Sequence, residues 1–220
     1  MNSKTSEMER LARQLYQSNR HRLDLLAGDK PETAVQLPVD RLFGTKPDWS
    51  RSVRLGKGDV RYSRHTKDTV SFLPVRWQDE LDRGGSLWSG CENWWAGYPL
   101  IAWVSIKAAD DGVAGHLKFN AEVGPVSDQK VRKGLIKALA AGACAEGAER
   151  IRFPAGATDR GRLYSRFLHA SAIDLADIRD TNEVERKLVQ LVAAFEPEIE
   201  LVARAIRQFL DAGAVPAAAR

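Results

Sequence analysis

Tryptophan is concentrated in one short window of this chain, and that window limits the fold more than any other feature. Four of the six tryptophans lie between residues 88 and 103. A strand-like stretch covers 99–108, a turn sequence follows at Asp110–Gly112, and residues 115–123 return with apolar side chains at every second position. Alternation of this kind is typical of a strand with one packed face. We therefore predict an antiparallel β-hairpin within residues 88–124.

The segments that flank this hairpin carry helical periodicity. Residues 6–27 have apolar side chains at near-helical spacing, and Gly28 and Pro31 follow as signals of a helix end. A second helix is predicted at 128–146, with Ser127 as its expected N-cap.

Two more helices are predicted near the C-terminus. Asp180 and Glu183 resemble a capping box and open a helix that Pro197 should end or kink, and a last helix follows at 199–209. The sequence therefore predicts an α+β fold: a small antiparallel sheet centred on the Trp-rich hairpin and flanked by helices, with N- and C-terminal helices.

The region before the hairpin differs in composition, because it is rich in Pro, Gly and charged residues. A short helix is expected near 33–43, interrupted at Pro38, and residues 46–67 are predicted to form a long loop with some strand character. A short strand is also expected at 150–153. We divide the chain into an N-terminal helical arm (1–30), a basic loop region (31–68), an α+β core with C-terminal helices (69–212) and a disordered tail (213–220).

Composition places the chain among ordinary globular proteins. With 220 residues, 44% of them hydrophobic, it can bury a core without disulfides or a metal. Cys91 and Cys144 lie in apolar settings, which predicts two buried thiols in a reducing compartment. We find neither a signal-peptide pattern nor an apolar run of the roughly 18 residues that a membrane span needs. We expect a cytoplasmic, bacterial protein without a membrane partner.

The net charge of +4 is unevenly distributed. A basic stretch with interleaved aromatic residues precedes the hairpin, and such a pattern favours binding to phosphates and unpaired bases of DNA or RNA. The candidate nucleic-acid-binding residues are Arg51, Arg54, Lys57, Arg61, Tyr62, Arg64 and Lys67. Arginines between 150 and 166 either extend this surface or pair with acidic residues of 174–200. The alternative for the basic stretch is a solvated loop.

Catalytic patterns are incomplete in this sequence. A magnesium-dependent nuclease of the common α/β type needs an Asp, then a strand that carries Asp or Glu, one residue, and Lys. Glu122 stands on the predicted return strand, but the position that needs Lys is Gly124. The weak candidates for such a site are Asp111, Glu122, Asp128 and Lys130. We otherwise predict no catalytic residue, no metal and no cofactor, with Mg²⁺ required only if the protein is a nuclease.

The aromatic residues Trp94, Trp95 and Tyr98 allow two interpretations. Aromatic anchors concentrate binding energy at protein interfaces, so exposed rings would indicate a partner-binding surface. Buried rings would place them in the core.

Several short motifs resemble a known family. A strand near Trp77, a Trp before a hairpin, the strand end Glu122-Val123-Gly124-Pro125 and a helix with Arg132 look like the C-terminal part of a large bacterial group in the PD-(D/E)XK nuclease superfamily. The stretch Phe195-Glu196-Pro197-Glu198-Ile199-Glu200 is similar to the end of those chains. The segment from Leu15-Tyr16 to Leu26 resembles a helix that follows their nuclease core.

This resemblance covers about residues 9–27 and 70–210. In that family the catalytic carboxylates and lysine lie upstream of the helix matched at 9–27, where this chain begins. The resemblance therefore implies an accessory domain without the nuclease core, to which no catalytic residue carries over. It also implies a mobile-element or phage-defence setting.

Our leading hypothesis is a non-catalytic binding or assembly module that acts on nucleic acid or a nucleoprotein complex. One alternative is a magnesium-dependent nuclease with a degenerate site. Another is a protein–protein regulator or inhibitor that uses the Trp-rich segment.

Overall fold

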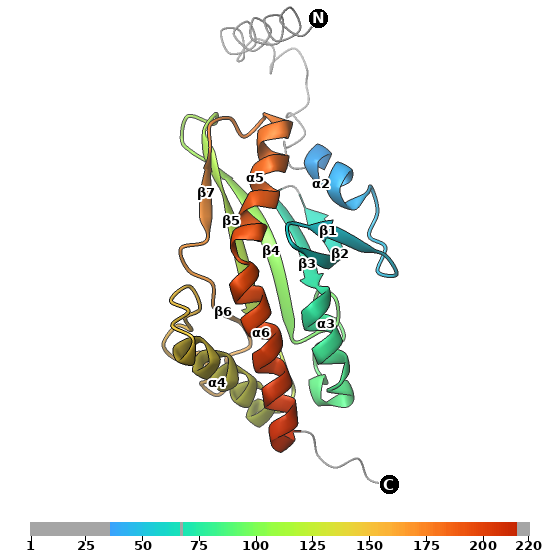
Figure 1. Cartoon of the computed structure of the whole chain (residues 1–220), viewed down its shortest axis with the longest axis vertical. Coiled ribbons are helices and arrows are strands. Elements are labelled where there is room, and N and C mark those ends of the chain that lie inside the picture. The colour runs from blue at the N-terminus through green and yellow to red at the C-terminus, as the bar shows by residue number, and fades with distance from the viewer. Residues whose placement is uncertain (1–35, 67, 215–220) are drawn as a thin grey trace, which may run out of the picture. The chain divides into compact units, whose positions relative to one another are not determined.

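The computed structural model describes residues 36–66 and 68–214, which form an α+β fold (Figure 1). The strands are β1 (Ser52–Leu55), β2 (Gly58–Thr66), β3 (Thr69–Pro74), β4 (Leu100–Ala108), β5 (Gly115–Val123), β6 (Ser165–Arg166) and β7 (Ala172–Leu175). The helices are α2 (Gln36–Phe43), α3 (Val75–Asp82), η1 (Gly85–Trp88), α4 (Gln129–Ala145), α5 (Thr181–Ala194), α6 (Glu196–Phe209) and η2 (Leu210–Ala214). The predicted fold class is confirmed. The helix predicted at 6–27 lies outside the described residues.

The seven strands form one antiparallel sheet, in which β1 to β6 are neighbours in chain order. The predicted hairpin is confirmed as β4 and β5, which pair from Leu100 and Val123 to Ala108 and Gly115. On its other edge β5 pairs with two short strands, β7 beside its start and β6 beside its end. The end of β5 therefore lies between the long hairpin partner and a strand of only two residues.

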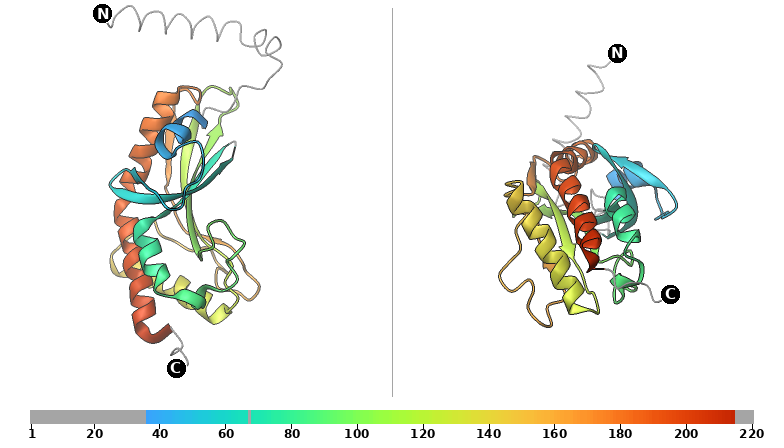
Figure 2. Two further views of the ribbon diagram at one scale, coloured as in Figure 1. Left: turned by 90° about the vertical axis from the view of Figure 1, so that its right-hand side faces the viewer. Right: turned by 60° about the horizontal axis from the view of Figure 1, so that its bottom comes forward.

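One face of this sheet packs against helices, and we call it the helix face. Figures 1 and 2 show α5 and α6 running along the sheet, with α6 between α3 and α4. Alternate residues of β5 are buried on this side, and Phe119 at their centre is fully buried. The Phe119 ring meets Phe195 edge-on at 5.4 Å and stacks on Phe72 at 6.0 Å. The core therefore lies between the sheet and these helices.

Ion pairs connect α3 to α6, the helix between α3 and α4. The buried Glu80 carboxylate accepts hydrogen bonds from Arg207 of α6 at 2.8 Å and from Arg83 at 2.7 Å. The hydrogen bond from Arg207 lowers the pKa of Glu80 despite its burial. At the start of α6, Nε of Arg150 donates to Glu198 at 2.8 Å, and the Arg150 guanidinium lies over the Phe195 ring.

The helix ends agree with the sequence in position and differ from it in detail. Asp128, rather than the expected Ser127, caps α4 by accepting from the backbone N–H of Lys130 at 2.7 Å. Asp180 caps α5 as expected, but Glu183 accepts from the N–H groups of residues 176 and 177, so no capping box forms. Pro197 marks the join of α5 and α6, where its missing N–H falls in the first turn of α6.

The loop predicted at 46–67 is wrong for most of its length, because β1 and β2 form a hairpin there. Val53, Leu55 and Val60 are buried on the helix face, and the basic residues between them hid this alternation. Pro38 does not interrupt α2, since it lies in the first turn. The strand expected at 150–153 is reduced to an isolated bridge between residues 151 and 168.

The two cysteines differ, so the prediction of two buried thiols was wrong for one of them. Cys91 is buried, which raises its pKa to about 12, and its thiol donates to the Pro125 carbonyl at 2.9 Å. Cys144 is exposed on α4. Among the described residues, no helix combines the length and apolar character needed to cross a membrane.

Candidate functional site on the loop face of the sheet

The second face of the sheet carries polar and aromatic side chains together with two fully buried aliphatic residues, Leu73 and Ile101. We call it the loop face. The strand register aligns Arg64 with Ser71, Ser71 with Trp103, and Trp103 with Asn120. Because directly opposed residues of antiparallel strands share a face, these four side chains form one row across β2 to β5. The neighbouring rows add Lys118, and Glu122 paired with Arg166.

Four side chains on this face form a continuous Arg–Trp stack, made of Arg64, Trp95, Trp103 and Arg166. The guanidinium carbon of Arg64 lies 4.5 Å from the Trp95 ring centre, and Trp95 stacks on Trp103 at 5.9 Å. Arg166 lies over Trp103 at 5.1 Å. Each arginine thus shares a cation–π contact with one ring, and both arginines remain exposed.

Trp95 reaches this position through a strained backbone. Its φ of 46° lies in the left-handed region, which costs a residue with a Cβ about 1–2 kcal/mol. The turn around it is held by hydrogen bonds from the N–H of Trp94 to Cys91 and from the N–H of Gly97 to Trp94, both 2.8 Å long. Such strain persists only where the surrounding structure over-determines it, and it clusters at functional sites.

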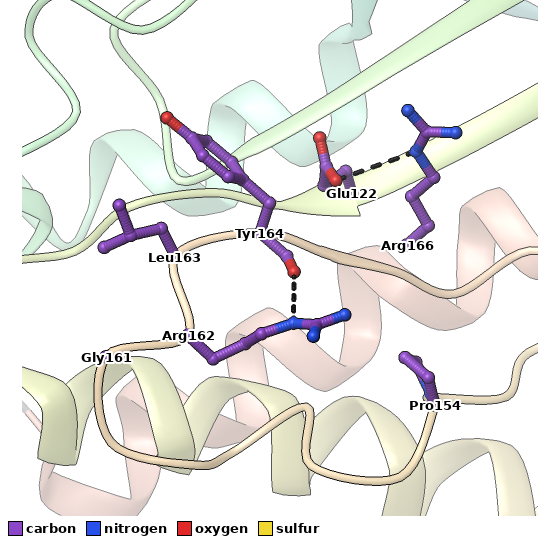
Figure 3. Close-up of a pocket in the computed structure, with 7 residues that line it drawn as sticks. All are labelled: Glu122, Pro154, Gly161, Arg162, Leu163, Tyr164 and Arg166. Carbon is purple, nitrogen blue, oxygen red and sulfur yellow. Dashed lines mark hydrogen bonds and ion pairs between the residues drawn. The ribbon is translucent and has the colours of Figure 1, made fainter.

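A pocket of about 540 Å³ opens beside the stack at the end of β5, and we call it the Glu122 pocket (Figure 3). Its lining residues come from β5, β6 and the loop before β6: Glu122, Pro154, Gly161, Arg162, Leu163, Tyr164 and Arg166. The Glu122 side chain is only 12% exposed, and its nearest cation is Nε of Arg166 at 3.8 Å. Among the described residues, no hydrogen bond reaches the Glu122 carboxylate.

Burial raises the pKa of Glu122, and the nearby arginines act against this shift. Arg166, Arg132 and Arg162 all favour the charged form, yet desolvation exceeds their sum. The carboxylate therefore lies in a basic environment, with Arg166 as its ion-pair partner and its oxygens on the pocket wall.

Arg132 holds the frame of the pocket from behind. Its side chain is 1% exposed, and its guanidinium donates to the carbonyls of Gly124 at 3.0 Å and Ala157 at 2.9 Å and to Oγ of Ser165 at 2.9 Å. These partners belong to the end of β5, the 154–164 loop and the start of β6. A single buried cation thus connects the three segments that line the pocket.

The rim of the pocket exposes apolar surface. Leu163 and Tyr164 are each 45% exposed, and they are two of the three large hydrophobic residues so exposed in the described chain. The Tyr164 ring is tilted against Trp94 at 6.1 Å, and its carbonyl accepts from Nε of Arg162 at 3.0 Å. A second pocket of about 530 Å³ shares Pro154 and Arg166 with the first. It extends the basic surface towards Lys118, His116 and His169.

The residues predicted to bind nucleic acid are divided by the structure. Arg51 and Lys57 are exposed, whereas Arg54 pairs with Asp59 at 3.4 Å. Arg61 donates to the carbonyl of Ser50 at 2.8 Å and to Gln78 at 3.2 Å, and Arg64 joins the Arg–Trp stack. Lys67 lies outside the described residues.

Tyr62 is buried, which is incompatible with its predicted role in stacking on a base. Its side chain is 1% exposed, its ring packs against Phe43 at 5.2 Å, and its hydroxyl is hydrogen-bonded to His65. The alternation of β2 turns it to the helix face, where it has no surface left for stacking on a base.

The aromatic residues predicted to bind a partner mainly serve the molecule's own packing. Trp94 is buried and lies directly over Gly124, where an added Cβ would be 2.3 Å from its ring. Tyr98 is half-buried, stacks on Trp49 at 6.2 Å and donates to Asp82 at 2.7 Å. Only Trp95, as part of the Arg–Trp stack, belongs to the loop face.

The structure does not bring the weak nuclease candidates together. Asp111 accepts from the N–H groups of the β4–β5 turn, and the length of β5 separates that turn from Glu122 by roughly 23 Å. Asp128 caps α4, with Lys130 exposed in its first turn. Within the described ranges, no three His, Cys, Asp or Glu side chains cluster as metal ligands would.

Sequence reasoning missed Arg162, Tyr164 and Arg166 as pocket residues, because their partner Glu122 is about 40 positions away in the chain. Their density of arginine and aromatic residues was the available signal. No protein-family model matches this chain, and comparison with curated proteins and with solved structures gives no significant match. The resemblance to the nuclease superfamily therefore stays a prediction.

Proposed function

We propose that this protein is a non-catalytic module that binds nucleic acid, alone or in a nucleoprotein complex, through the loop face. The observation that carries the proposal is the union of exposed cations and aromatic rings on one side of the sheet. Arg64, Lys118 and Arg166 are exposed there, and Tyr164 offers an exposed ring. Cations of this kind neutralise backbone phosphates, and aromatic rings stack on unpaired bases.

The pairing of the other arginines supports this choice of surface. Arg150 is occupied by Glu198 and the Phe195 ring, so it serves the fold. Arg166 is 68% exposed, and Glu122, the carboxylate paired with it, is 12% exposed. The predicted surface before the hairpin therefore continues through Arg64 onto the face that also carries Arg166. From the resemblance described above, we place the module in a mobile-element or phage-defence setting.

The test compares two double variants with the same change of charge. Arg64→Glu with Lys118→Glu reverses two cations of the loop face, and Lys133→Glu with Lys137→Glu reverses two exposed cations of α4. Binding of labelled single-stranded and duplex oligonucleotides is measured by fluorescence anisotropy across a salt series.

The loop-face variant should bind at least tenfold more weakly than wild type, and its salt dependence should fall by about one phosphate contact per lost cation. The α4 variant should bind like wild type. Equal losses in both variants, or no binding by wild type at low salt, would contradict the proposal. Adding Arg61→Glu to Arg64→Glu tests how far the surface extends towards β1.

The nuclease alternative draws no support from the arrangement of its candidate residues. Mg²⁺-dependent cleavage that is abolished both by a chelator and by Glu122→Ala would establish it in place of the binding function. Capture of a defined protein partner, lost on substitution of Trp95, would instead favour the regulator alternative.

A further inference from the structure

The Glu122 carboxylate offers two hydrogen-bond acceptor oxygens to the pocket that it lines. It is 12% exposed, accepts no hydrogen bond within the described part of the chain, and faces a pocket rather than the core. Its ion pair with Nε of Arg166, at 3.8 Å, is longer than a hydrogen bond, so both carboxylate oxygens can accept from a molecule in the pocket. A ligand that brings donors to this carboxylate would satisfy them.

The other residues that line the pocket indicate which chemical groups such a ligand should carry. Arg162 and Arg166 flank the pocket and favour a ligand that also carries negative charge. Leu163 and the Tyr164 ring offer exposed apolar surface at its rim. A volume of about 540 Å³ lies within the usual range for small-molecule sites, which is about 300–1,000 Å³. A nucleotide combines all of these requirements: a planar ring, hydrogen-bond donors and a phosphate.

The four bases differ in what they present to a carboxylate. Guanine has N1–H and its N2 amino group side by side, so it can donate to both oxygens at once. Adenine and cytosine place their amino group next to a ring nitrogen that is an acceptor, and uracil places its N–H between two carbonyl oxygens. Only guanine avoids setting an acceptor against the second carboxylate oxygen.

We infer that the Glu122 pocket recognises a guanine base of a single strand that lies across the loop face. This inference rests on the proposed function and adds base selectivity to it. Glu122 accepts from guanine N1–H and N2–H, Tyr164 stacks on or beside the base, and Arg162 and Arg166 bind the adjoining phosphates. A duplex does not fit this role, since its Watson–Crick edges are already paired.

The pocket is preformed for this task by Arg132. Because that guanidinium joins the end of β5 to Ala157 and Ser165, the strand that carries Glu122 and the loop that carries Arg162 are fixed relative to each other. A preorganised site loses less conformational entropy on binding than one that must assemble around its ligand.

The experiment uses the full chain and strands of about ten nucleotides, within the site sizes known for single-strand binders. The strands are a uridine tract and the same tract with one central guanosine, inosine or adenosine, each with a deoxy counterpart. Wild type should bind the guanosine strand about tenfold more tightly than the adenosine strand, as expected for one good bidentate contact. Inosine lacks the N2 amino group and should fall between the two.

Glu122→Gln is the matching protein variant, and Glu149→Gln, at an exposed position outside the pocket, is its control. Glu122→Gln should remove the preference for guanosine and leave binding to the plain uridine tract within about twofold of wild type. Glu149→Gln should keep the preference.

The outcomes distinguish a failure of the proposed nucleic-acid binding from a failure of the proposed guanine recognition. If no strand binds wild type at low salt, the proposed function fails. If all strands bind equally, or if Glu122→Gln keeps the preference, the inference fails and the binding function stands. Uniformly tighter binding of every strand to Glu122→Gln, without a base preference in wild type, would show that the carboxylate acts only as an unfavourable charge.

Discussion

Neighbouring residues of β5 belong to two surfaces with opposite character. Phe119 points into the helix face, where it is fully buried between Phe72 and Phe195. Lys118, one position earlier, is exposed on the loop face. Because side chains alternate along a strand, one nine-residue strand supplies both surfaces. The comparison indicates that the helix side of β5 contributes to the core, whereas the loop side of the same strand presents charged groups, Lys118 and Glu122, at or near the surface.

Two features of the loop face have a cost in stability. Trp95 holds a left-handed backbone conformation, and Glu122 is largely buried without a hydrogen bond in the described structure. The helix side treats its buried glutamate differently, since Glu80 accepts from Arg83 and Arg207. A protein built only for stability would satisfy both carboxylates. This difference in hydrogen bonding between Glu80 and Glu122 favours a ligand-binding role for Glu122 on the loop face.

The sharpest test of this comparison substitutes adjacent residues of β5. Phe119→Ala should lower the free energy of unfolding by about 3–5 kcal/mol, because it removes a buried ring from the core. Lys118→Ala should change it by no more than about 0.5 kcal/mol. Urea denaturation followed by tryptophan fluorescence measures both. Similar losses for the two variants would contradict the division of the sheet into a structural and a binding face.

The second prediction concerns Arg132, the buried cation that joins the segments lining the Glu122 pocket. Arg132→Leu should cost about 3 kcal/mol, because the carbonyls and the hydroxyl that it satisfies would stay buried without donors. Arg204→Leu is the control, since Arg204 pairs with Glu146 on the surface and should contribute less than about 1 kcal/mol. Limited proteolysis should also show faster cleavage in the 154–164 loop of Arg132→Leu. An unchanged cleavage rate would mean that the loop is held by other contacts.

These two residues also show how far the sequence could predict the structure. The sequence predicts Phe119 on a packed strand face, because local alternation and a turn signal identify the β4–β5 hairpin. Arg132 has the sequence pattern of an ordinary helix residue, and only the approach of residues 157 and 165 makes it a buried connector. β6 has two residues, too few for any periodicity, so the segment that completes the pocket gave no strand signal.

The candidate site was harder to predict than the fold for the same reason. The basic stretch includes Arg64, but the ring that contacts it, Trp95, and the ring stacked on Trp95, Trp103, come from two later segments. The bias of tryptophan towards the core made Trp95 ambiguous, and its left-handed conformation is set by the turn around it. Long-range pairing, which composition and spacing do not contain, decides which arginines face a pocket and which pair with glutamates.

A third prediction tests the Arg–Trp stack as a part of the loop face. Trp95→Ala should lower stability by about 1–2 kcal/mol, since it removes a half-buried ring that contacts Arg64 and Trp103. Trp95→Phe keeps a ring and should recover most of that loss. Both are measured by urea denaturation, together with oligonucleotide affinity. A full core-sized loss for Trp95→Ala, comparable to Phe119→Ala, would show that the stack belongs to the structural core.

The smallest expected effect is a difference in pH dependence between Glu122 and Glu80, whose pKa values shift in opposite directions. Burial raises the pKa of Glu122 in the folded protein, so the folded state binds its proton more tightly than the unfolded state does. This group therefore makes the protein more stable as the pH falls through the folded pKa towards the unfolded value. At pH 7 the charged form is a cost, and Glu122→Gln should raise stability by about 0.5 kcal/mol.

Glu80 should behave in the opposite way, because the hydrogen bond from Arg207 lowers its pKa in the folded state. Its contribution is present above the unfolded pKa and is lost as the pH falls through the folded one. Glu80→Gln should therefore destabilise the protein at pH 7, and its gap to wild type should close in acid. Unfolding curves for both variants between about pH 3 and pH 7 give the two signs directly. If Glu122→Gln is also destabilising at pH 7, its carboxylate has a structural partner in solution and the argument for a ligand at that position loses its basis.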